Sequence, residues 1–160
     1  MNQQLAPIEV LIDDMTQGNL AGTVLNILAL RGNRRNGNTV EITNNFLPGR
    51  PMTLSLGGWA IQRQRFATRV YMIYENQNDF SAVLRHFDFL SQFIEGNDRL
   101  IIVTHQLGGN LLSSVRRTWL QYNYSQVYVN MNNVDVDFIL RTVYEAVCND
   151  GRSAIASPNY

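Results

Sequence analysis

The sequence contains no lysine, so all 13 of its basic residues are arginine. This absence excludes Schiff-base chemistry and the lysine of a phosphate-binding P-loop. One cysteine, Cys148, excludes an intrachain disulfide and a zinc site built from several cysteines. The only histidines, His86 and His105, form neither an HxH nor an HxxxH spacing, so no metal site is predicted.

Charge and long apolar runs are also scarce. The 13 acidic side chains balance the 13 arginines, which argues against non-specific binding to nucleic acid or anionic membranes. No apolar run approaches the roughly 20 residues that cross a bilayer, and the N-terminus lacks the regions of a signal peptide. We therefore expect a soluble protein that is made in a cytoplasm and has no membrane partner.

Neutral amides are abundant instead. Asn and Gln together number 28 of the 160 residues, a length that fits one domain. A surface rich in amides forms hydrogen bonds readily and carries little charge to repel a second copy, although Asn-rich loops are also common in solitary β proteins. Arginine suits protein interfaces better than lysine, and codon bias explains the absence of lysine equally well.

One amphipathic helix is predicted, from Asp79 to Glu95. Its apolar side chains recur at helical spacing, and Gly96 is a suitable stop; they are Phe80, Val83, Leu84, Phe87, Leu90 and Ile94. Around this helix we expect three regions: a lead-in over 1–21, a β domain over 22–148 and a flexible tail over 149–160. The lead-in includes the apolar run from Ile8 to Ile12.

Strand patterns lie on both sides of this helix. Val24 to Leu30 is interpreted as a buried strand, and a Gly/Asn-rich loop then leads to the alternating segment around Val40 and Ile42, which indicates a hairpin. A second hairpin is expected from the alternating residues Met52 to Leu56 and from Arg65 to Glu75, which is apolar on both faces.

The C-terminal half reads as further strands. Leu100 to Val103 suits a central strand, and Val115 to Val129 is long, aromatic and β-prone. Val134 to Tyr144 alternates apolar and polar residues, which favours a strand, with a helix from Asp137 to Val147 as the alternative. The predicted fold is therefore α+β and mainly β: an antiparallel sandwich or barrel of two hairpins and C-terminal strands, flanked by one helix.

Catalytic motifs are missing. The sequence contains no GxSxG, GxxxxGK[ST] or GxGxxG motif. Asp135 and Asp137 would share a strand face as an acid–base or cation-binding pair, but such a pair more often marks the wet face of an edge strand. Arg34 and Arg35 suit a solvated hairpin tip or a subunit contact better than nucleic-acid binding. No catalytic residue, metal or cofactor is predicted.

Several segments together carry a resemblance to a known family. They are Val24–Arg31, Thr39–Thr43, Leu47-Pro48-Gly49, Arg65–Glu75 leading into the helix at Asp79, and the closing segment Asp135–Tyr144. Their order, over roughly 22–147, resembles the tail-tube proteins of contractile phages and their baseplate relatives. The resemblance is one of pattern, without a diagnostic motif.

This resemblance implies a structural virion protein, not an enzyme. It would form a hexameric ring, and rings would stack into a tube that conducts DNA as non-specific cargo. Its partners would be copies of itself and other tail or baseplate proteins, assembled in the host cytoplasm. Subunit contacts are expected at Arg31, Asn33, Arg34, Arg35, Asn36, Arg69, Tyr71, Asp135, Asp137 and Arg141. Tube lumens in this family are usually acidic, and this neutral chain leaves room for a baseplate, neck or terminator ring or a secretion-system tube.

Two alternatives come from other classes of function. One is a monomeric β-rich domain that binds a ligand through Trp119, Tyr122 and Tyr124, of which the two tyrosines would share a face as a stacking platform. The other is a small hydrolase that uses Asp135 and Asp137.

Overall fold

The computed structural model describes nine ranges of the chain and four single residues. These are residues 7–15, 19–42, 51–57, 67–75, 94–95, 98–104, 123–130, 135–148 and 154–156, with the single residues 85, 89, 92 and 133. All structural statements below concern these residues.

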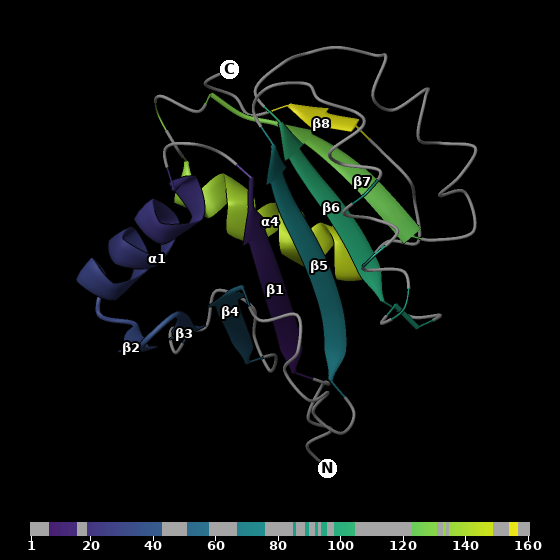
Figure 1. Cartoon of the computed structure of the whole chain (residues 1–160). Coiled ribbons are helices and arrows are strands. Elements are labelled where there is room, and N and C mark those ends of the chain that lie inside the picture. Colours follow the sequence, from purple (N-terminus) through teal and green to yellow (C-terminus); the bar gives the residue numbers. More distant parts are fainter. Residues whose placement is uncertain are drawn as a thin grey trace.

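The described strands form one sheet in the order β2-β3-β4-β1-β5-β6-β7-β8 (Figure 1). Their bounds are β1 Ile8–Asp14, β2 Arg34–Asn36, β3 Thr39–Ile42, β4 Met52–Leu56, β5 Thr68–Glu75, β6 Arg99–Thr104, β7 Asn123–Tyr128 and β8 Ala154–Ala156. From β4 to β8 every neighbouring pair runs parallel. The β2–β3 hairpin continues the sheet beyond β4 with antiparallel pairs.

The predicted class, α+β with more strand than helix, is confirmed. The predicted antiparallel sandwich or barrel is wrong, because the strands form one mixed sheet whose centre is parallel. The second predicted hairpin is also wrong: β4 and β5 both pair with β1, which lies between them. Parallel strands buried on both faces read as continuous apolar runs, and Val10–Ile12 and Leu100–Val103 are runs of this kind.

The segment from Val24 to Leu30 is a helix, not the expected strand. It belongs to α1, Leu20–Leu30, in which Leu20, Val24, Leu25 and Leu28 are buried. These positions follow the three- and four-residue intervals of a helix. A segment that begins at Val24 is too short to display this period, and Leu20 completes it.

The closing segment is likewise helical, which corrects the expected strand over 134–144. Helix α4 spans Val136–Cys148. Its apolar positions satisfy both periods, because Val136, Ile139 and Val143 lie at helical spacing within a run that also alternates. Asp135 accounts for the start of the helix, since its Oδ1 accepts the N–H of Phe138 at 3.0 Å as an N-cap.

The expected first hairpin exists in a shorter form. Its strands are β2 and β3, so β2 lies within the residues that were expected to form the loop. Gly37 follows β2 with a φ of 59°, which is the positive φ that a two-residue hairpin turn requires.

The expected boundaries of the domain also change. Strand β1, which falls within the expected lead-in 1–21, lies in the middle of the sheet and is part of the domain. Strand β8, within the expected tail, pairs with β7. Of the predicted helix 79–95, Arg85 and Phe89 are helical, whereas Ile94 and Glu95 are not; the rest of the predicted helix, apart from residue 92, lies outside the described residues.

Helices α1 and α4 pack on the same face of the sheet (Figure 1). α1 contacts β1, β3 and β4, and α4 contacts β5, β6 and β7. The opposite face of the central strands is buried as well, since Leu11, Tyr71, Ile73 and Ile102 are at most 1% exposed. Because both faces of the central strands are buried, a binding site on the sheet is expected at the strand ends or at the edges. No helix among the described residues is long and apolar enough to span a membrane.

Candidate binding site at the carboxyl ends of the parallel strands

The chain changes direction in the sheet at β1. After β1 it passes through α1 and the β2–β3 hairpin to β4 on one side of β1, and it then crosses to β5 on the other side. In open sheets of parallel strands, ligands bind outside the carboxyl ends of the strands at such a reversal. The carboxyl ends of β1 and β5 are therefore the first place to look for a site.

Strand β1 ends in two carboxylates, Asp13 and Asp14, whose side chains point to opposite faces of the sheet. Oδ2 of Asp14 accepts the N–H of Ala21, in the first turn of α1, at 2.7 Å. The pairing with β5 continues one residue further, because the Met15 N–H donates to the carbonyl of Tyr74 at 2.8 Å. Asp14 is thus held between the end of the sheet and the start of a helix.

The start of α1 is shaped by a backbone conformation that few residues adopt. Asn19 precedes the helix with a φ of 49° and a ψ of 53°, in the left-handed region that Asn tolerates. A Cβ at Gly22 would lie 2.8 Å from the Asn19 Nδ2, so glycine leaves the room that the amide occupies. This packing brings the first N–H groups of α1 to Asp14.

Tyr74 lies beside Asp14 in register on β5. Its side chain is 0% exposed, and its hydroxyl has no hydrogen-bond partner in the described part of the chain. Burial, and secondly the negative charge of Asp14, raise the pKa of the Tyr74 phenol above its ordinary value. The hydroxyl is therefore neutral, and its capacity to donate and accept hydrogen bonds is unused.

A second hydroxyl of this kind lies on the opposite face of the sheet. Thr104, the last residue of β6, is 1% exposed, and its Oγ1 has no hydrogen-bond partner within the described segments. Its register neighbour is Glu75, the last residue of β5, which is 3% exposed. Tyr74 and Thr104 are the only unpartnered buried side-chain polar groups of the described residues, and both lie at this end of the sheet.

The described acidic, histidine and cysteine side chains do not form a metal centre. Among the described residues, no three side chains of His, Cys, Asp or Glu converge in a way that could hold an ion. The groups at this end, two buried hydroxyls and nearby carboxylates, instead suit an organic ligand that offers hydrogen-bond donors.

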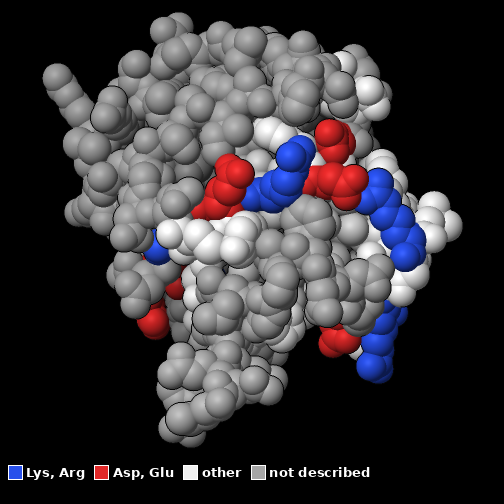
Figure 2. Space-filling view, turned by 180° about the vertical axis from the view of Figure 1, so that it is seen from behind, with Lys and Arg blue, Asp and Glu red and all other residues white. Residues whose placement is uncertain are grey.

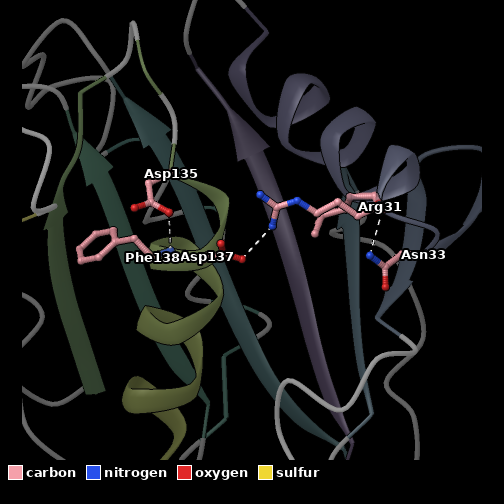
Figure 3. A network of polar contacts seen from close by, with 6 residues as sticks. Arg31, Asn33, Asp135, Asp137 and Phe138 are labelled. Carbon is pink, nitrogen blue, oxygen red and sulfur yellow. Dashed lines mark hydrogen bonds and ion pairs between the residues drawn. The ribbon is translucent and has the colours of Figure 1, made fainter.

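The structure uses several of the expected interface residues within the chain. Arg31, at the end of α1, forms an ion pair with Asp137 of α4 at 2.8 Å, and Asp135 caps α4 (Figure 3). Asn33 is buried and its side-chain amide donates to the carbonyl of Leu28 at 2.9 Å. Asp135 and Asp137 are therefore helix-terminal residues, not a pair on one strand face, which corrects that expectation.

Arg69 and Tyr71 are not at a surface. They are 3% and 0% exposed, and the Nε of Arg69 donates to Oε2 of Glu9 at 3.3 Å. The Arg69 Nη1 also donates to the Tyr71 hydroxyl at 3.4 Å. An interface role for this pair would require the interior of the sheet to open, so the expectation is corrected: they belong to the core.

The remaining expected contacts are accessible. Arg34, Arg35 and Asn36 form the exposed edge strand β2, and Arg141 is exposed on α4. Arg35 folds back to the carbonyl of Gly37 and to the side chain of Asn26. Figure 2 shows acidic and basic side chains alternating in a band across the face behind Figure 1, so charges of one sign do not gather there in the described part.

The structure describes only part of the alternative ligand-binding site that the sequence suggested. Trp119 and Tyr122 lie outside the described residues, and Tyr124 is described only as part of strand β7. The carboxyl-end site was not predicted. Its available signal was the pair Asp13-Asp14 directly after the apolar run of β1, which is where a parallel strand meets a ligand site.

Comparison with models of known protein families finds no match to this chain, and comparison with curated proteins finds none either.

Proposed function

We propose that this protein is a binding domain whose small organic ligand lies at the carboxyl ends of β1, β5 and β6. The observation that carries the proposal is the buried, unpartnered hydroxyl of Tyr74 beside Asp14, at the point where the chain reverses direction in the sheet. An unsatisfied buried hydroxyl destabilises a fold by about 1–3 kcal/mol. A ligand that supplies the missing partner offsets this loss.

The rest of this region supports the same proposal. Thr104 repeats the feature on the next strand. Its main-chain carbonyl accepts the Val129 N–H at 2.9 Å, whereas its side-chain hydroxyl has no partner in the described part of the chain. Side-chain hydroxyls are among the polar groups that orient ligands in binding sites.

A fragment screen on isotopically labelled protein tests this proposal. Bound fragments should shift the backbone amide resonances of Met15, Ala21, Glu75 and Thr104 more than that of Thr68 at the amino end. Tyr74→Phe should weaken this binding while leaving the fold intact. Fragments that bind only elsewhere in the molecule would contradict the proposal.

A second candidate function is the ring-forming component of a phage tail or related tube, located in the virion. The observation that favours it is the open edge of the sheet at β2, whose residues are all exposed. An unpaired edge strand is a template for pairing with a neighbouring subunit. Of the segments that carry the resemblance, 24–31 and 135–144 are largely helical, whereas β3 and β5 are strands, so we rank this function second.

Mass measurement and electron microscopy of concentrated protein separate the two candidates. The second candidate predicts hexamers, rings or tubes that depend on β2. The first predicts a protein whose ligand binding does not change with protein concentration. A monomer at all concentrations would contradict the ring-forming role.

A further inference from the structure

The described charges at the carboxyl ends of β1 and β5 are of one sign. Asp13 and Asp14 end β1, and Glu75 ends β5. Among the described strand residues, the arginines of the parallel strands are Arg69 and Arg99, which lie at the amino ends of β5 and β6. The charges of the described strands therefore favour a positively charged group over a negative one at these carboxyl ends.

The helix terminus nearest this region already holds a carboxylate. The first N–H groups of a helix are ordinarily a site for phosphate. In α1, however, the Ala21 N–H donates to Asp14 at 2.7 Å. A phosphate bound there would have to displace Asp14. This competition disfavours an anionic ligand.

The buried hydroxyls supply a second and independent observation. Tyr74 lies near enough to Asp14 for that charge to raise the pKa of its phenol, so its hydroxyl and the carboxylate occupy the same end of the sheet. Ligand N–H groups would donate to the carboxylate and to the hydroxyl oxygen together. On the other face of the sheet, the Thr104 hydroxyl likewise lies on the strand next to a carboxylate residue, Glu75.

We infer that the ligand at this site carries an amine or guanidinium group, which the carboxyl ends recognise by charge and the hydroxyls by hydrogen bonding. This inference rests on the proposed function and goes beyond it, because it assigns the class of ligand. Asp14 is the principal recognition residue, since it is fixed by a helix N–H at 2.7 Å and lies beside Tyr74.

Three small probes of similar size test the inference by titration of the labelled protein: guanidinium chloride in the millimolar range, urea as its neutral counterpart, and inorganic phosphate. Guanidinium should shift the amides of Met15, Ala21 and Glu75 selectively. Asp14→Asn should weaken this binding about tenfold or more, since a hydrogen bond to a charged group is lost. The side-chain oxygen of asparagine can still accept the Ala21 N–H, so the fold should be retained.

Glu145→Gln is the matched control, because Glu145 is exposed on α4 and the substitution removes the same charge from another place. It should leave guanidinium binding unchanged, and an equal loss in both variants would overturn the inference. Urea binding as well as guanidinium, or phosphate binding in its place, would also overturn the ligand class while the proposed site stands. If no probe shifts these amides selectively, both the inference and the proposed function fail.

Discussion

The two ends of the parallel strands treat buried polar groups in opposite ways. At the amino ends, Arg69 donates to Glu9 and to the Tyr71 hydroxyl, and the Nε of Arg99 donates to the carbonyl of Ala146 at 2.8 Å. At the carboxyl ends, the hydroxyls of Tyr74 and Thr104 are buried without partners in the described part of the chain.

This difference separates stability from binding within one sheet. The polar groups of the amino ends are matched inside the chain, and breaking a match there removes the partner of a buried charge. The hydroxyls of the carboxyl ends have no partner in the described part of the chain, and we propose that a ligand supplies one. Function in open parallel sheets is expected at the carboxyl ends, so the end that holds the unpartnered hydroxyls is also the end where we propose a ligand.

The largest effect is expected at the amino end. Arg69→Met should lower the free energy of unfolding by about 3–5 kcal/mol, because it removes the guanidinium that pairs with the buried carboxylate of Glu9. Urea denaturation followed by circular dichroism measures this loss. The double variant Glu9→Leu/Arg69→Met should recover most of the stability, since both charges of this buried pair are then removed. If Arg69→Met alone is as stable as the wild type, the matched polar groups of the amino ends do not stabilise the fold, which would contradict the comparison.

Alkaline pH should reveal the burial of Tyr74. Because burial raises the pKa of its phenol above the ordinary value of 10.0, the folded state keeps a proton that the unfolded state loses above that pH. Below pH 10.0 this group should therefore add no pH dependence to the free energy of unfolding. Above pH 10.0 it should make the free energy of unfolding fall as the pH rises, by up to about 1.4 kcal/mol per pH unit. Denaturation across this range should give a shallower decline in Tyr74→Phe; equal slopes would contradict the burial.

A smaller loss is expected at a polar group that is matched at a helix end. Asp135→Ala should lower the free energy of unfolding by about 1 kcal/mol, because the Phe138 N–H loses its cap. Asp135→Asn should be close to wild type in the same denaturation experiment. If alanine and asparagine behave alike, Asp135 does not act as a cap.

The smallest effect belongs to the exposed ion pair that joins the two helices. The side chains of Arg31 and Asp137 are 48% and 56% exposed, and exposed pairs contribute at most about 1 kcal/mol. Arg31→Ala should therefore change stability little, and added salt should remove even that difference. A loss of several kcal/mol that persists in high salt would show that this contact holds the helices together.

The sequence predicts the strand-rich mixture of helix and strand and several individual strands, but not their arrangement. Met52–Leu56 alternates cleanly and Leu100–Val103 is continuously apolar, and both form strands. Val136–Cys148 satisfies both the helical and the alternating period, and the Asp135 cap decides between them only once its hydrogen bond is known. Parallel pairing depends on contacts between distant segments, such as β1 with β5, which local patterns do not specify.

The candidate site could not be predicted from the sequence either, because it also depends on contacts between distant segments. Tyr74 and Thr104 look like ordinary strand residues in the sequence, and only burial and the absence of a partner distinguish them. Asp135 and Asp137 attract attention because they lie two residues apart, yet one caps a helix and the other pairs with Arg31. The spacing of two carboxylates in the sequence therefore does not reveal what either of them does in the fold.

The free energy of unfolding of Tyr74→Phe and Thr104→Val tests the central claim most directly. Each substitution removes a buried hydroxyl and keeps the shape of the side chain, and removing an unpartnered group is neutral or stabilising. We predict that both variants unfold at the same urea concentration as the wild type or at a higher one. A loss of more than about 1 kcal/mol in either variant would show that its hydroxyl is already partnered within the chain, which would contradict the account.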